Sequence, residues 1–147
     1  MRERDTKKEY YLEIARSVSK RSTCNRRQYG AIIVNNNEVV STGYNGSPRG
    51  CTNCCDIGKC YRELNNINHG EMYEKCISVH AEQNAIISAS RKEMYGGTLY
   101  LAGFEDGNEI SAEPCKICCR MIINSGIYKV VNKDREYRFE DLRNMIV

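Results

Sequence analysis

The sequence has no tryptophan, two phenylalanines, two prolines and two histidines among its 147 residues. It also lacks any apolar run approaching the ~18 residues that a membrane-spanning helix needs. The N-terminus, MRERDTKKEYY, has no apolar segment of the kind found in signal peptides. From these absences we expect neither a membrane helix nor a secretory leader, and therefore a cytoplasmic protein.

A marked excess of charge of one sign is absent as well. The formal net charge is +3, and this small value is weak support for a nucleic-acid partner. The hydrophobic content of 41% and the charged content of 28% are those of an ordinary globular chain. At this length the chain can bury a core without disulfides, and we expect one domain over residues 1–147.

Cysteine, in contrast, is abundant, with nine residues in the chain. Disulfides are rare in a reducing compartment, so thiols at this density are better interpreted as metal ligands than as a disulfide framework. Cys51, Cys54 and Cys55 fall within five consecutive positions, which favours metal binding there.

Hydrophobic periodicity predicts alternating strands and helices. Thr6 and Glu9 have the spacing of a capping box and open a helix over about 6–20. Runs rich in β-branched residues at 29–34 and 38–44 flank three asparagines and predict a hairpin. We further expect a helix at 78–90, a strand at 98–102, an acidic loop at 104–112, a helix at 115–124, a strand at 127–131 and a short C-terminal helix. This order predicts an α/β fold with a mixed sheet and helices on both faces.

Residues from about 45 to 76 form a Cys-rich insertion that shows neither the helical period of about 3.6 residues nor the strand period of about 2. A long loop without regular structure is unusual inside a compact domain unless something holds it. The cysteines of this segment are the obvious means.

Two short motifs bring metal ligands to helix starts. Ser78–Ile87, SVHAEQNAII, contains His80 and Glu82, and EPCKICCRM, at 113–121, contains Cys115 and Cys118. A helix N-terminus favours thiolates and hence metal binding. One imidazole and two thiolates are three zinc ligands, and in a catalytic site the fourth position stays open for water.

The chemistry of such a site is the addition of water to a carbon–nitrogen double bond. Zinc lowers the pKa of bound water from ~15.7 toward ~7, and Glu82 would move protons between water, ring nitrogen and departing amine. Residues two apart on a helix point in different directions, so His80 must lie at the very start of its helix. The alternative is a closed zinc knuckle, with His80 as a histidine of the core. This alternative leaves the presence of Glu82 and Pro114 unexplained.

The H-x-E and P-C-x-x-C motifs are the signature of zinc deaminases. With TCNRRQYGAIIV, STGYNGSPRG, CISVHAEQNAI and PCKICCRMIINSGI, the chain resembles the deoxycytidylate (dCMP) deaminase family of the cytidine deaminase superfamily, including related competence-operon proteins. The resemblance implies a three-layer α/β/α sandwich around a central mixed sheet of about five strands. It also implies hydrolysis of dCMP to dUMP and ammonia by a homo-oligomer, often a hexamer, activated by dCTP and inhibited by dTTP.

Matched positions imply roles for four further residues. Asn45 in the GYNG turn would contact the nucleotide, and Arg26 would bind its phosphate, because a guanidinium offers bidentate donors. Tyr137 would assist at the phosphate, although the spacing after Val131 departs from the family pattern. Arg91 matches an arginine implicated in regulation and the subunit interface. For any single arginine the alternative is a solvated surface residue.

The remaining cysteines suggest a second metal site. Cys24, Cys54, Cys60 and Cys76 together form the ligand set of a closed structural zinc site, with similar relatives carrying cysteines at corresponding places. Competing ligands are Cys51, Cys55 and His69, and free buried thiols are the alternative. Cys119 is interpreted as a packing residue.

We therefore expect a zinc-dependent dCMP deaminase with Glu82 as its proton shuttle. One alternative is deamination of another nucleoside, nucleotide or base, including a base in tRNA, for which the basic segment 20–27 offers contacts. The other is a non-catalytic nucleotide-binding module linked to DNA uptake. The intact Glu82 argues against a pure binding module.

Overall fold

The computed structural model describes residues 1–147 as a mixed six-stranded sheet with helices on both faces. The strand order is β2-β1-β3-β5-β6, and β4 pairs with β3 beside this path. The strands are β1 Arg27–Asn35, β2 Glu38–Tyr44, β3 Thr98–Glu105, β4 Asn108–Ile110, β5 Lys129–Val131 and β6 Glu136–Arg138.

Only β3 and β5 run parallel; every other pairing is antiparallel. Parallel neighbours need a crossover connection, and helix α6 (Lys116–Ser125) supplies it. The crossover places the start of α6 beside the start of another helix on the same face, α4 (Ala81–Ile87).

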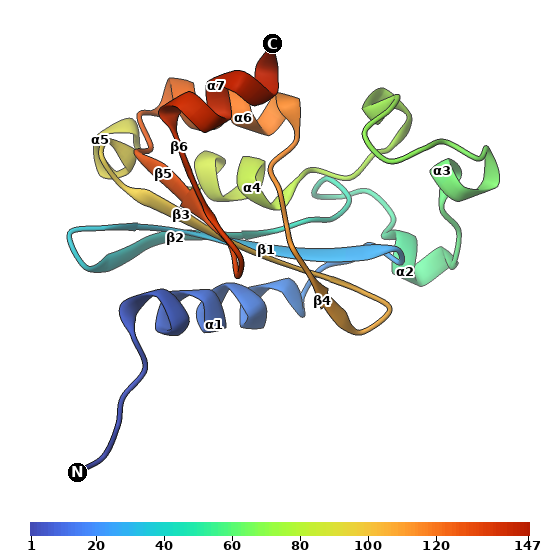
Figure 1. Cartoon of the computed structure of the whole chain (residues 1–147). Helices are drawn as coiled ribbons and strands as arrows, with labels where there is room; N and C mark the ends of the chain where they lie inside the picture. The colour runs from blue at the N-terminus through green and yellow to red at the C-terminus, as the bar shows by residue number, and fades with distance from the viewer.

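The helices form two unequal layers, which Figure 1 shows on opposite sides of the sheet. Helix α1 (Lys7–Ser19) alone covers one face, whereas α4, α6 and the C-terminal α7 (Phe139–Ile146) cover the other. The short α5 (Arg91–Met94) lies between α4 and β3 in the chain. The predicted α/β/α layering is confirmed, with one strand more than the expected five.

Each face of the sheet has its own core, because successive strand residues point to opposite sides. In β1, Ala31 and Ile33 join the cluster under α4, α6 and α7, whereas Ile32 and Val34 join the cluster under α1. The hydrophobic run of this strand is therefore buried on both faces. A core on each side fixes the sheet that carries α4 and α6.

Glycines allow both helix layers to approach the sheet closely. A Cβ on Gly30 would lie 2.1 Å from the Ala15 carbonyl oxygen of α1, and one on Gly43 would lie 2.4 Å from the Ala81 oxygen of α4. Neither position has room for a side chain. Gly43 thus sets the distance between β2 and α4.

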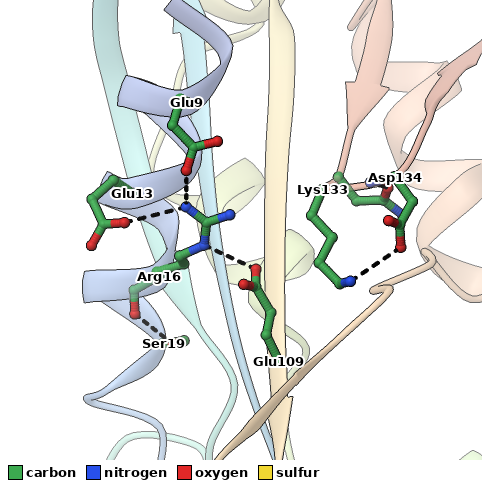
Figure 2. A network of polar contacts seen from close by, with 8 residues as sticks. Glu9, Glu13, Arg16, Ser19, Glu109, Lys133 and Asp134 are labelled. Carbon is green, nitrogen blue, oxygen red and sulfur yellow. Dashed lines mark hydrogen bonds and ion pairs between the residues drawn. The ribbon is translucent and has the colours of Figure 1, made fainter. Parts of the chain in front are cut away.

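Figure 2 shows how α1 is tied to the β3–β4 hairpin. The Arg16 guanidinium lies between Glu9 and Glu13 of its own helix and Glu109 of β4, with Nε 2.9 Å from the Glu109 carboxylate. These three carboxylates offset the cost of partly burying the guanidinium. The network links the first helix to a hairpin at the end of the sheet.

Two strands were not predicted from the sequence. The acidic stretch expected to be a loop at 104–112 contains the end of β3 and all of β4, joined by Asp106 and Gly107 with φ of 51° and 78°. An Asp-Gly pair with positive φ at both positions favours a tight hairpin turn, and that signal is present in the sequence. Strand β6 is three residues long with two exposed side chains, so it offers no usable pattern.

The Cys-rich insertion is less irregular than expected. It contains α2 (Cys54–Ile57), α3 (Tyr61–Leu64) and the 3₁₀ turn η1 (Tyr73–Lys75), and it projects beyond one end of the sheet in Figure 1. The predicted helix at 78–90 is shorter, with α4 ending at Ile87 and α5 following separately. None of these helices combines the length and the apolar character required to span a membrane.

Candidate functional site

Three potential metal ligands meet where α4 and α6 begin. His80 is the N-cap of α4 and Cys115 the N-cap of α6, whereas Cys118 lies in the first turn of α6. The His80 Nδ1 lies 3.5 Å from the Cys115 Sγ and 3.4 Å from the Cys118 Sγ. All three donor atoms lie within 4.8 Å of one another.

These separations fit one zinc ion. Tetrahedral zinc with its usual bonds to nitrogen and sulfur separates those two atoms by about 3.6 Å. The observed distances of 3.5 Å and 3.4 Å are close to that value. One nitrogen and two sulfur donors are also a preferred zinc set, and three ligands leave a fourth position open.

Backbone contacts orient these ligands. The His80 N–H donates to the Gln83 side-chain oxygen at 2.8 Å, which holds the chain as it enters α4. The Cys118 N–H donates to the Cys115 Sγ at 3.4 Å, so the helix start favours a thiolate at that sulfur. Hydrogen bonds from Cys118 and His80 lower the pKa of the Cys115 thiol.

Glu82 lies in the first turn of α4 and is 5% exposed. Burial raises the pKa of its carboxyl. His80 precedes the helix with extended backbone angles, φ −72° and ψ 154°. The His80 side chain therefore does not follow the direction that a regular helix would give it. Glu82 can then lie beside the same three donors.

His80, Cys115 and Glu82 line a cavity of about 890 Å³. Tyr73 of η1 packs edge-on against His80, with ring centroids 5.2 Å apart. Four guanidinium groups also line the cavity; Arg120 of α6 is exposed, and we call the three less exposed ones, Arg26, Arg27 and Arg62, the arginine cluster. A cavity with a metal-type site and several cationic side chains is suited to a small anionic ligand.

The structure places the two predicted nucleotide-binding residues in this lining. Asn45 is buried; its Oδ1 accepts from the Ser22 hydroxyl at 2.6 Å and the Tyr29 N–H at 2.8 Å, and its Nδ2 donates to the Arg27 carbonyl. The Asn45 amide therefore also holds the turn together. The Arg26 Nε lies 3.3 Å from the Glu63 carboxylate.

Tyr137 and Arg91 lie elsewhere. Tyr137 is 1% exposed, is not part of the cavity lining, and donates its hydroxyl to the Glu113 carboxylate at 3.1 Å. The Tyr137 hydroxyl is thus engaged by an exposed carboxylate that itself lines the cavity, so any contact of Tyr137 with a phosphate stays a prediction. Arg91 is exposed and donates to the Asn124 carbonyl in the last turn of α6 at 2.6 Å.

The four cysteines proposed for a second metal lie in one neighbourhood. Burial, together with the nearby thiols of Cys24, Cys76 and Cys60, raises the pKa of Cys54. Their sulfurs do not form a group as tight as that of the first site. Among the competing ligands, Cys51 and Cys55 are exposed, and the His69 ring lies 2.6 Å from the Arg27 guanidinium. Cys119 is buried in the core, as predicted.

Sequence reasoning missed Arg62 and Tyr73. Both belong to the Cys-rich insertion, where polar residues without a period resemble a solvated loop. Arg62 is nevertheless 6% exposed. No pattern marks it in the sequence; only the expectation that the insertion is held down points to this segment.

Two helix starts bring one imidazole and two thiols together beside a buried carboxylate, on a three-layer α/β fold. This arrangement is that of the zinc-dependent deaminases. Residues 5–133 match the model of the cytidine and deoxycytidylate deaminase zinc-binding region. The chain belongs to this family.

Named relatives agree with this assignment. Deoxycytidylate deaminase of Mycobacterium phage D29 is 36% identical over 128 residues, covering 84% of this chain and 91% of the relative. The human enzyme of the same name is 33% identical, covering 90% and 67%. The crystal structure of dCMP deaminase from the cyanophage S-TIM5 with dCMP and dUMP superposes with a TM-score of 0.66 at 28% identity, covering 99% of this chain and 93% of that one.

Proposed function

We propose that this chain, acting as one domain, is a dCMP deaminase that hydrolyses dCMP to dUMP and ammonia. The observation that carries the proposal is the convergence of His80, Cys115 and Cys118 beside the buried Glu82 in a cavity with a cationic lining. The relatives crystallised or named with this activity support the same substrate. The reaction is hydrolysis of a carbon–nitrogen bond in a cyclic amidine.

His80, Cys115 and Cys118 would hold a zinc ion, which when bound would lower the pKa of a coordinated water toward ~7 and so supply the nucleophile at neutral pH. Glu82 accepts a proton from the water and delivers it to the N3 nitrogen of the pyrimidine as the new C4–oxygen bond forms. The Glu82 carboxylate then takes the remaining proton from the new C4 hydroxyl and passes it to the amino group, so that the C4–nitrogen bond breaks, a C4 carbonyl forms and ammonia leaves. Burial raises the pKa of Glu82, and this helps the carboxyl to hold the proton between the two transfers.

The other predicted residues bind the nucleotide in this proposal. Asn45 has a second Nδ2 hydrogen for the base or sugar in addition to its bond to Arg27. Arg26 faces the cavity and is paired with Glu63, whose side chain is largely exposed; exchanging that partner for a phosphate costs little. Tyr137 is assigned an indirect role through Glu113.

The test is the variant Glu82→Ala, assayed for ammonia release from dCMP. Because Glu82 is not one of the three ligands, the variant should keep its zinc, measured by elemental analysis. Loss of a general acid–base group typically costs a factor of 10²–10⁴ in rate. Full turnover in a folded, zinc-containing variant would refute the mechanism.

Parallel assays of dCMP, cytidine, deoxycytidine and dCTP separate this function from its rivals. If the protein prefers a nucleoside or another base, the assignment of dCMP as its substrate is wrong. If the zinc-loaded protein turns over none of these compounds, a binding module is favoured. The intact site with Glu82 favours the enzyme.

We also propose a structural zinc on Cys24, Cys54, Cys60 and Cys76. Two hydrogen bonds that join the chain on either side of Cys24 to Cys54 and Cys55 support this proposal: the Asn25 amide donates to the Cys54 carbonyl at 2.8 Å, and the Cys55 N–H donates to the Thr23 carbonyl at 3.0 Å. Cys24, Cys60 and Cys76 also line the same cavity. A closed tetrahedral site of four sulfurs would hold the insertion against the body of the chain. The alternative ligand His69 is already in contact with Arg27.

We also propose that the protein is a cytoplasmic homo-oligomer, with a hexamer favoured, and that Arg91 lies near a subunit interface. In this proposal dCTP and dTTP act as effectors. Exposed apolar side chains next to Arg91 support an interface there, since Ile87 is 70% and Tyr95 75% exposed. Nine free thiols are consistent with a reducing compartment.

A further inference from the structure

Arg62 on α3 is a buried cation without an acidic partner. Its residue is 6% exposed and it lines the cavity. Buried arginines are normally paired with a carboxylate, because an uncompensated charge is costly in the interior. Arg62 forms no ion pair, and its side chain donates only to the Met72 carbonyl at 2.9 Å and the Asn68 carbonyl at 2.6 Å. A guanidinium has five N–H donors, so several remain for a ligand.

The other members of the arginine cluster have carboxylate partners. Arg26 pairs with Glu63, and the Arg27 Nε lies 2.9 Å from the Glu105 carboxylate. Glu74 also lines the cavity but pairs with none of the three arginines. His69 lies among them; burial and then Arg27, Arg26 and Arg62 lower its pKa. Within the arginine cluster, the charge that no carboxylate compensates is therefore that of Arg62.

Arg62 is separated from the proposed zinc ligand His80 by the side chain of Tyr73. Its guanidinium carbon is 5.2 Å from the centre of the Tyr73 ring, and that ring is 5.2 Å from the His80 ring. One tyrosine side chain thus separates the cation from the zinc ligands. This spacing matches a ligand that places a reacting ring at His80 and an anionic group at the other end of a short sugar.

The backbone keeps Arg62 in place. Met72, whose carbonyl accepts from Arg62, has φ 47° and ψ 49°, a left-handed conformation that is rare for a residue other than glycine. The turn at Met72 directs the next residue, Tyr73, toward His80. Strained backbone of this kind persists only where its surroundings hold it, and it is concentrated at functional sites.

We propose that Arg62 binds the phosphate of the nucleotide substrate, so that the Cys-rich insertion selects a nucleotide over a nucleoside. The identity of the anion as a phosphate monoester rests on the proposed deaminase function. Arg26 faces the same cavity, and the two guanidiniums would share the phosphate oxygens.

The test compares Arg62→Met with Arg120→Met in the zinc-loaded protein. Arg120 is an exposed arginine of α6 at the same cavity and has no ion pair, so it provides a matched loss of charge. Arg62→Met should lower kcat/KM for dCMP by roughly 10- to 100-fold, the value of one or two charge-assisted hydrogen bonds. Turnover of deoxycytidine should be unchanged, and Arg120→Met should leave the preference for dCMP as it is.

Binding measurements make the result independent of catalysis. Calorimetric titration with inorganic phosphate and with dUMP should show a matching loss of affinity in Arg62→Met. If the protein deaminates none of the substrates, the proposed function fails, and these titrations still decide the role of Arg62. Phosphate binding that is absent from the parent protein, or unaffected by Arg62→Met, would overturn the inference.

A purely structural role is separated by two further variants. Arg62→Lys keeps the charge and should retain part of the preference for dCMP. Met72→Gly relaxes the left-handed residue while keeping Arg62, and should also retain the preference. Equal losses for dCMP and deoxycytidine in Arg62→Met would mean that the residue only holds the loop, contrary to the proposal.

Discussion

At the scale of single residues, the site depends on groups that the helix ends hold in unusual positions. His80 lies before the first turn of α4, and both His80 and Glu82 line the same cavity although they are two residues apart. A regular helix would separate them. The HAE motif therefore brings its two functional side chains together because the helix begins directly after the histidine.

A second residue-scale constraint on this geometry is Gly43. In Gly43→Ala the new methyl group would lie 2.4 Å from the Ala81 oxygen and the Ala85 nitrogen, so α4 has to move away from β2. Overpacking of this kind typically costs about 1–3 kcal/mol. We expect a lower urea midpoint together with weaker zinc retention.

Thr42→Ala is the control for Gly43→Ala, because Thr42 is exposed on the neighbouring position of β2. It should leave stability and zinc content unchanged. A Gly43→Ala protein as stable as its parent would show that α4 is less tightly seated than the structure indicates.

Residues differ in how well the sequence reveals them. His80, Glu82, Cys115 and Cys118 were predictable, because their chemistry depends on local spacing at helix starts. Arg62 was not, because its burial arises from contacts with Asn68 and Met72 in a turn that no periodic pattern describes.

At the scale of elements, the Cys-rich insertion contrasts with the rest of the fold. Helices α1 and α6 and the β1–β2 hairpin were predictable because apolar period, caps and turn residues agree there. In the insertion those signals are missing, and its short helices α2 and α3 are four residues each. Such helices are fixed by what surrounds them, since so few residues cannot form a stable helix alone.

The proposed structural zinc gives a prediction for this element. Cys54→Ser should release one zinc equivalent, and proteolysis should then cut within residues 51–76. Zinc binding to small thiolate sites is worth on the order of 10 kcal/mol, far more than these short helices supply. Elemental analysis and limited proteolysis measure the two effects.

Cys51→Ser is the matched change, because the Cys51 thiol is exposed and is not one of the four proposed ligands. It should alter neither zinc content nor the cleavage pattern. An unchanged zinc content in Cys54→Ser would mean that the four thiols hold no ion.

At the scale of the whole molecule, exposed apolar side chains lie between the end of α4 and the start of β3. Ile87 and Tyr95 flank Arg91, whose guanidinium donates to the Asn124 carbonyl at the end of α6. If this surface joins subunits, Arg91→Glu should shift the assembly toward smaller species in light scattering. An inverted charge is costly in a buried interface.

Arg143→Glu provides the comparison for Arg91→Glu, since Arg143 is an exposed arginine of α7 near Glu140. The assembly should keep its mass in that variant. A monomeric parent protein, or an Arg91→Glu protein of unchanged mass, would remove the assigned interface.

Hydrogen bonds within the protein orient the proposed zinc ligands. His80 and Cys115 come from two helix starts that lie far apart in the chain, and the contacts from His80 to Gln83 and from the Cys118 N–H to the Cys115 sulfur belong to the protein itself. These contacts would help the fold to position the ligands around a zinc ion, whereas a zinc finger must fold around its metal. If the three proposed ligands hold zinc, we expect the ion to load and exchange in the folded protein, at rates set by access through the cavity rather than by unfolding.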